Sequence, residues 1–152
     1  MEKFFVDPDI TQAETLPPRF YKSQEIFEKL KETVFLKTWQ WIGDSASTVP
    51  LAETVHPFVM LPDFLSEPLL LVRDKDSEVK CLSNVCTHRG NILINEPCTI
   101  KKHITCGYHG KQFDTCGKFK FIPKTEGMQN FPSEKDDLPE IAVAKWRQFI
   151  FS

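Results

Sequence analysis

Hydrophobic residues recur at helical spacing near the N-terminus of the chain. Ile26, Leu30 and Val34 lie four positions apart, which is the spacing of residues on one face of an α-helix. Ser23 precedes this run and is a favourable N-cap residue. The pattern predicts a helix over residues 24–36 within an N-terminal arm.

Beyond this arm, the pattern changes to short runs of strand-forming residues separated by turn residues. The predicted strands are 38–43, 54–61, 68–73, 79–84, 103–105, 112–114, 118–121 and one or two within 141–151. Many short strands at close spacing are typical of an antiparallel β-sandwich or small barrel. The sequence therefore predicts a mainly β fold, with an arm and helix over 1–37 and a β-rich domain over 38–152. Cys116-Gly117 is expected to form a hairpin turn, and the polar segment 124–137 a surface loop.

Composition narrows the class of protein. The 152 residues include 19 basic and 21 acidic side chains, for a formal net charge of -2. That balance gives no electrostatic footprint for nucleic acid. No apolar run approaches the roughly 18 residues of a membrane span, and the N-terminus lacks the features of a signal peptide. We therefore expect a cytoplasmic protein with neither nucleic acid nor membrane as a partner.

Five cysteines, an odd number, argue against a disulfide framework. Two segments combine cysteine with histidine: Cys86-Thr87-His88 and Cys106-Gly107-Tyr108-His109. Each offers one soft sulfur and one imidazole nitrogen, and Gly90, Gly107 and Gly110 are expected to allow tight loops. Four such residues at matched spacing predict a metal centre held by two loops.

Zinc and iron are the two alternatives for this centre. A Cys2His2 set can bind zinc, but zinc loops usually pair Cys with Cys and His with His. The single residue between Cys86 and His88 is tight for chelating one tetrahedral ion, whereas it suits ligands of two different metals. A two-iron cluster would take Cys86 and Cys106 on one iron and His88 and His109 on the other. We expect the cysteines to be buried and the histidines to lie at an exposed tip.

The spacing Cys-x-His followed by Cys-x-x-His resembles the Rieske [2Fe-2S] signature. Similar stretches occur at 38–43, 70–75, 82–90, 106–110 and 146–151. From about Phe35 onward, the chain resembles the N-terminal domain of the alpha subunit of Rieske non-haem iron ring-hydroxylating oxygenases.

The resemblance implies a Rieske [2Fe-2S] cluster bound by Cys86, His88, Cys106 and His109. It also implies a ferredoxin or flavin reductase as electron donor, a mononuclear-iron catalytic domain as acceptor, and a homotrimer of the full-length protein. The alternative is a free-standing Rieske ferredoxin, a carrier and not an enzyme. Small Rieske ferredoxins begin almost directly with a strand, so the long N-terminal arm favours the oxygenase.

The chain departs from the family pattern at two positions beside the ligands. Lys111 stands where the family usually has Trp, and Gly107 stands where Pro is common. The other histidines, His56 and His103, lie in no pattern typical of a mononuclear iron site, and His103 is expected to be an exposed loop residue. We therefore expect oxidoreductase activity only as part of a larger protein, and an excised or truncated domain.

The other three cysteines lie outside the two loops. Cys98 and Cys116 are expected to be free thiols, since neither stands where the high-potential relatives carry their disulfide. Cys81 lies in a strand-like run and is expected to be a small buried hydrophobic residue.

Overall fold

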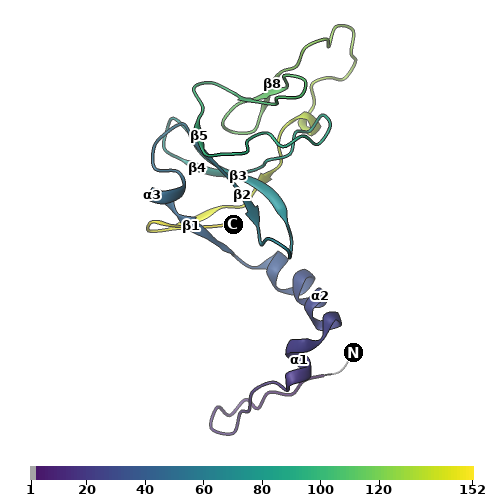
Figure 1. Ribbon diagram of the computed structural model, residues 1–152, viewed down its shortest axis with the longest axis vertical. Helices are drawn as coiled ribbons and strands as arrows, with labels where there is room; N and C mark the ends of the chain where they lie inside the picture. The colour runs from purple at the N-terminus through teal and green to yellow at the C-terminus, as the bar shows by residue number, and fades with distance from the viewer. Residues whose placement is uncertain (1–2) are drawn as a thin grey trace. The chain divides into compact units, whose positions relative to one another are not determined.

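A computed structural model describes residues 3–152 of the chain. The chain divides into two compact units, of which the first ends at Thr38 and the second begins at Trp39 (Figure 1). This division lies one residue from the boundary that the sequence pattern predicts.

The first unit is helical. It contains α1 (Pro18–Lys22), α2 (Gln24–Thr33) and the 3-10 helix η1 (Phe35–Lys37). Ser23 caps α2, and its Oγ accepts a hydrogen bond from the Ile26 N–H at 3.4 Å. The predicted helix is confirmed, but the α-helix ends at Thr33. The chain then tightens, because the Lys37 N–H bonds to the Val34 carbonyl three residues back.

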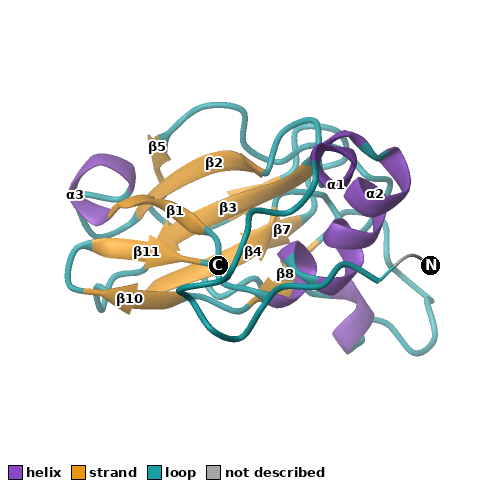
Figure 2. Cartoon of the chain, turned by 90° about the horizontal axis from the view of Figure 1, so that it is seen from below, coloured by secondary structure: helices purple, strands orange, loops and turns teal. Residues whose placement is uncertain are grey.

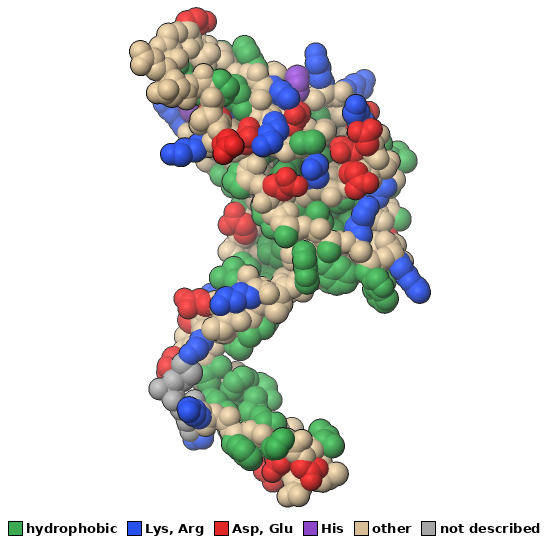
Figure 3. All heavy atoms as spheres, turned by 180° about the vertical axis from the view of Figure 1, so that it is seen from behind, with side chains coloured by type: hydrophobic (Ala, Val, Ile, Leu, Met, Phe, Trp, Pro, Cys, Tyr) green, Lys and Arg blue, Asp and Glu red, His purple; other side chains and the backbone are tan. Residues whose placement is uncertain are grey.

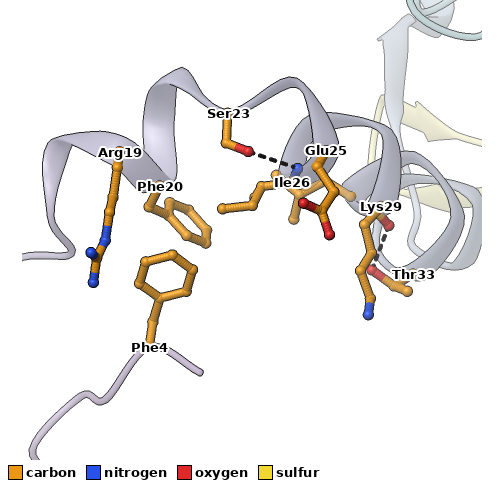
Figure 4. A pocket seen from close by; sticks show the side chains of 9 residues that line it. Phe4, Arg19, Phe20, Ser23, Glu25, Ile26, Lys29 and Thr33 are labelled. Carbon is orange, nitrogen blue, oxygen red and sulfur yellow. Dashed lines mark hydrogen bonds between the residues drawn. The ribbon is translucent and has the colours of Figure 1, made fainter. Parts of the chain in front are cut away.

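Aromatic packing organises the start of this unit, where α1 had not been predicted. The Phe4 ring lies edge-on to the Phe20 ring, with centroids 5.2 Å apart, and the Arg19 guanidinium lies 5.6 Å from the centroid of the Phe4 ring. A cavity of about 290 Å³ lies against these side chains and one face of α2 (Figure 4). No residue of α2 is fully buried, so its apolar face is only partly covered.

A five-stranded antiparallel sheet forms the centre of the second unit, in the order β5-β2-β3-β4-β9 (Figure 2). Its strands are β2 (Thr54–Met60), β3 (Glu67–Arg73), β4 (Val79–Ser83), β5 (Cys98–Thr99) and β9 (Glu140–Ile141). Strands β2 and β3 pair along their full length. The strands predicted at 54–61, 68–73 and 79–84 are confirmed to within one residue at each end.

Strand β3 is buried on both faces. Successive side chains of a strand point to opposite faces of its sheet. Leu70 and Val72 therefore enter one hydrophobic core, while Leu69 and Leu71 enter a second. The first core also contains Cys86 and Cys106, so both cysteines of the predicted metal centre are part of it.

Two three-stranded antiparallel sheets complete the unit. One has the order β1-β11-β10 and the other β6-β7-β8. Their strands are β1 (Trp41–Asp44), β10 (Ala144–Trp146) and β11 (Phe149–Phe151), and then β6 (Ile104–Thr105), β7 (Gln112–Phe113) and β8 (Phe119–Phe121). The mainly β fold with an N-terminal helix is confirmed.

Several predicted boundaries need correction. The first strand begins at Trp41 rather than residue 38, and it runs on to Asp44, which then caps the short helix α3 (Ser45–Thr48). The C-terminal run breaks into three strands, and the turn between the last two has Arg147 at a φ of 55°. The segment 124–137 is largely loop, as predicted, but includes the 3-10 helix η2 (Glu134–Asp136).

Charged side chains of both signs are interspersed over the face of the second unit seen in Figure 3. This distribution agrees with the small net charge. Within residues 3–152, no helix is long and apolar enough to cross a membrane.

Candidate functional site

The two Cys/His segments form loops with the same backbone hydrogen bonds. The Cys86 N–H donates to the Asn91 carbonyl at 2.9 Å, and the Gly90 N–H donates to the Cys86 carbonyl at 3.0 Å. In the second loop, the Cys106 N–H bonds to the Lys111 carbonyl at 2.8 Å and the Gly110 N–H to the Cys106 carbonyl at 3.0 Å. The sequence spacing is thus translated into two closely similar loops.

Glycine is required where each of these loops closes. Gly90 and Gly110 have φ values of 70° and 73°, in the left-handed region that other residues avoid. Gly107, by contrast, does not have a positive φ, and a Cβ there would meet nothing within 4 Å. The expectation that glycines permit tight loops is therefore confirmed for two positions and is wrong for Gly107.

The two cysteine sulfurs are buried and surrounded by hydrogen-bond donors. Cys86 and Cys106 are 2% and 3% exposed. Burial raises the pKa of the Cys86 thiol, and the neighbouring Cys106 thiol raises it further. Burial acts the same way on Cys106, but hydrogen bonds from the Tyr108 N–H, the Cys86 thiol, the His109 N–H and the Asn91 amide together outweigh it and lower the pKa of that thiol. Such donors stabilise a sulfur that carries negative charge.

The two imidazoles lie side by side at the surface end of the site. The ring centroids of His88 and His109 are 4.8 Å apart, and the Tyr108 ring lies 3.8 Å from that of His109. His88 is exposed and His109 is half-buried. The pKa of His88 is lowered by partial burial and then by the charge of His109. Both sulfurs are buried as expected, whereas only one of the two imidazoles, that of His88, is exposed.

The donor atoms of the two loops fit a metal centre. The Nδ1 atom of His109 is buried and has no hydrogen-bond partner among the described residues. A buried nitrogen of this kind requires a partner, and a metal ion supplies one. The pairs of two sulfurs and two imidazoles match the ligands that each iron of a Rieske centre takes from the protein.

Residues outside the signature hold the first loop. The amide of Asn84, which is 3% exposed, donates to the Ile94 carbonyl at 2.8 Å and accepts from the Ile94 N–H at 3.0 Å. The Thr87 Oγ1 donates to the Asp136 carbonyl oxygen at 2.8 Å. Sequence reasoning did not assign a role to Asn84, Thr87 or Asp136. A polar residue directly after a buried strand was the available signal for Asn84.

Lys111 is the largest departure from expectation in this region. Its side chain is 2% exposed, and its Nζ lies 3.0 Å from Asp136 Oδ1. Together with His88 and His109, these two residues line a cleft of about 460 Å³.

The remaining candidates lie outside the site. All five cysteines fall within the described residues, and none forms a disulfide. Cys81 is fully buried, as expected, and Cys98 is exposed. His56 lies in β2, and His103 is half-buried rather than exposed as predicted. It directly precedes β6, whose Ile104 is fully buried.

Comparison with known proteins places these loops in a family. The sequence model of the family described as Rieske [2Fe-2S] domain matches residues 39–132, more than half of the chain. The carnitine monooxygenase oxygenase subunit of Escherichia coli (strain K12) is 32% identical over 150 residues, which cover 99% of this chain and 38% of that protein. The biphenyl dioxygenase subunit alpha of Paraburkholderia xenovorans (strain LB400) is 28% identical, covering 90% of this chain and 30% of that protein.

Solved structures show the same fold. A quaternary ammonium Rieske monooxygenase in complex with L-carnitine superposes with a TM-score of 0.81 at 27% identity, over 91% of this chain and 38% of that one. Naphthalene 1,2-dioxygenase from Rhodococcus sp. shares the fold with a TM-score of 0.79 at 19% identity, over 94% of this chain and 32% of that one. The chain spans well under half the length of these proteins.

Proposed function

The chain belongs to the Rieske [2Fe-2S] domain family, and we propose that it carries electrons as the Rieske domain of an oxygenase alpha subunit. The observation that supports this most directly is the extent of similarity. The match to a carnitine monooxygenase oxygenase subunit covers 99% of the chain, so it includes the N-terminal arm as well as the cluster loops. This coverage favours an oxygenase subunit over a free-standing Rieske ferredoxin, which remains the alternative.

The family binds a Rieske-type [2Fe-2S] cluster, and we propose four ligands in this chain. Cys86 and Cys106 hold one iron, and His88 and His109 hold the other. Three features support this assignment: the two buried sulfurs, the adjacent imidazoles and the unpartnered Nδ1 of His109.

The residues around the site treat the sulfurs and the imidazoles differently. The N–H groups of His88, Tyr108 and His109 point to the two sulfurs and favour their negative charge. Burial of Cys86 and Cys106 excludes water from the two sulfurs, while His88 remains exposed at the surface. When bound, a Rieske cluster takes up and releases single electrons. The exposed imidazole edge is therefore the shortest route for electrons between the site and a partner.

The proposed partners follow from the same assignment. The electron donor is a ferredoxin or flavin reductase, and the acceptor is a mononuclear iron in a catalytic domain. The description of one related structure, a quaternary ammonium Rieske monooxygenase, refers to inter-subunit electron transfer. We propose the same for this protein, with a homotrimer as the assembly of the full-length form.

Metal analysis tests the proposed cluster. The purified chain should be red-brown, contain about two irons and two inorganic sulfides, and bleach reversibly on reduction with dithionite. One zinc per chain without labile sulfide would overturn the proposal.

Substitutions test the ligand assignment. Cys86→Ser and Cys106→Ser should each lose nearly all iron, because both sulfurs are assigned to the same iron. Cys98→Ser is the matched control, since its thiol is exposed and lies outside both loops. Circular dichroism would establish that each variant retains its strands. Equal iron loss in the Cys98→Ser protein would contradict the assignment.

Product analysis tests the division of roles. Supplied with NADH, an oxygenase reductase, oxygen, and aromatic or quaternary-ammonium substrates, the chain should become reduced but form no hydroxylated product. Substrate-dependent product from the pure chain would contradict the assignment of the chemistry to a separate catalytic domain.

A further inference from the structure

Lys111 is a buried cation beside the proposed ligands. Its ammonium group lies 5.6 Å from the centroid of the Phe113 ring and 5.3 Å from that of Phe119. Its one ion-pair partner among the described residues is Asp136, at 3.0 Å. Removing an ammonium group from water is costly unless it is paired and hydrogen-bonded. The aromatic faces and the carboxylate offset that cost.

Asp136 connects this lysine to both proposed cluster loops. Its backbone carbonyl accepts a hydrogen bond from Thr87, which lies between two proposed ligands in the first loop. Its carboxylate binds Lys111, which directly follows the second loop. The other carboxylate oxygen accepts from the Ser133 N–H at 2.9 Å and the Ser133 hydroxyl at 3.2 Å. One residue of η2 therefore restrains both loops at once.

The positive end of this ion pair lies at the proposed site. Lys111 directly follows the loop that carries Cys106 and His109, and its backbone carbonyl accepts the hydrogen bond of the Cys106 N–H at 2.8 Å. The Lys111 side chain lines the same cleft as His88 and His109. Because this side chain is only 2% exposed, water screens its charge little.

We propose that the Lys111–Asp136 pair is a positioning element that restrains the two cluster loops, and that the Lys111 charge raises the reduction potential of the bound cluster. The physical reason is electrostatic, because the cluster gains negative charge when reduced and a nearby cation favours the reduced state. This inference rests on the proposed ligand set.

The test is the midpoint potential, measured by a redox titration followed by electron paramagnetic resonance. Lys111→Met should lower the equilibrium constant for reduction by on the order of tenfold, equivalent to ~59 mV for a one-electron couple. Asp136→Asn should shift the potential in the opposite direction, since it removes the anion and keeps the cation. Lys111→Arg should restore a potential close to that of the unmodified protein.

A second ion pair on the same unit provides the control. Lys118 and Asp137 lie 2.9 Å apart, but the lysine side chain is 64% exposed. Lys118→Met should therefore leave the potential unchanged, because water screens an exposed charge. If Lys111→Met fails to retain iron, Lys111→Gln provides a polar replacement with the same expected decrease.

Two outcomes would overturn this inference. If Lys111→Met and Lys118→Met have equal midpoint potentials, the buried charge of Lys111 has no effect on the reduction potential of the cluster. A decrease of equal size in Asp136→Asn would show that displacement of the loops, rather than charge, controls the potential. The iron and sulfide content of the unmodified protein distinguishes failure of this inference from failure of the proposed cluster. If the unmodified protein contains the cluster and either outcome is observed, only this inference fails.

Discussion

Replacing Asn84 tests whether one buried amide holds the first cluster loop. Both polar atoms of its side chain bond to Ile94, at 2.8 and 3.0 Å. The Leu93 N–H also donates to the Asn84 carbonyl at 3.0 Å. The segment that follows the first loop is therefore fastened to the end of the central sheet by this residue.

The expected cost of Asn84→Ala follows from these bonds. Removing one partner of a buried hydrogen bond costs about 1–2 kcal/mol, because the remaining group loses both its partner and its water. Two such bonds give a decrease of about 2–4 kcal/mol in the free energy of unfolding. Single domains are stable by only about 5–15 kcal/mol, so the loss is large. Urea denaturation at constant m-value would measure it.

Asn84→Asp gives a sharper version of the same test. The introduced carboxylate keeps an acceptor for the Ile94 N–H but turns a second oxygen toward the Ile94 carbonyl. Burial and this repulsion raise the folded-state pKa of the new carboxyl above its unfolded value. Its protonated form alone can donate, so the variant should recover stability relative to the unmodified protein as the pH falls through that raised pKa.

Asn95→Ala is the control, since Asn95 is exposed on the same segment. It should change the free energy of unfolding by no more than about 0.5 kcal/mol. If Asn84→Ala costs no more than this control, the two bonds to Ile94 do not hold the loop. Iron release into a chelator should also be faster from Asn84→Ala, since the loop carries Cys86.

Three further predictions concern backbone, thiol and carboxyl groups. Gly117→Ala should lower the free energy of unfolding by about 1–3 kcal/mol more than Gly127→Ala does, as measured by urea denaturation. Both glycines have φ near 80°, but only at position 117 would a Cβ lie 3.1 Å from a core leucine methyl group. Equal losses in the two variants would contradict this reason. Burial raises the pKa of Cys81 to about 11. A thiol reagent near pH 8 should therefore label the exposed Cys98 and should not label Cys81 until the protein unfolds. Comparable labelling rates for the two cysteines in the folded protein would refute this prediction. Burial raises the pKa of Asp114, but hydrogen bonds from a lysine and two backbone N–H groups outweigh burial and lower the pKa below its ordinary value of 3.8. The stability that this shift contributes is present above pH 3.8 and is lost as the pH falls through the folded-state pKa. Asp114→Asn should therefore make Tm less dependent on pH in the acid range.

The elements predictable from the sequence were those with a strong local signal. The helix that begins after Ser23 has a cap and a regular apolar spacing, and the central strands consist of near-continuous apolar runs. Strands β5 and β9, of two residues each, were not predicted as separate strands. They exist because neighbouring strands offer them hydrogen bonds, which is a long-range property.

The candidate ligands could also be predicted from residues close together in the sequence. The spacing of Cys86 with His88 and of Cys106 with His109 predicts two loops, and glycines at 90 and 110 allow each loop to close. Chemistry of this kind is readable because each loop is built from residues adjacent in the chain.

What surrounds those ligands was decided by the tertiary structure. The sequence shows Lys111 only as a lysine where the family usually has Trp, and a lysine is normally expected at the surface. Its partner Asp136 lies 25 residues further along the chain. Pairing of the buried Lys111 depends on the η2 segment, which contacts both loops through Asp136, and Phe113 and Phe119 lie near the ammonium group. A favourable environment for a buried charge comes from groups distant in sequence, and only the folded chain brings them together.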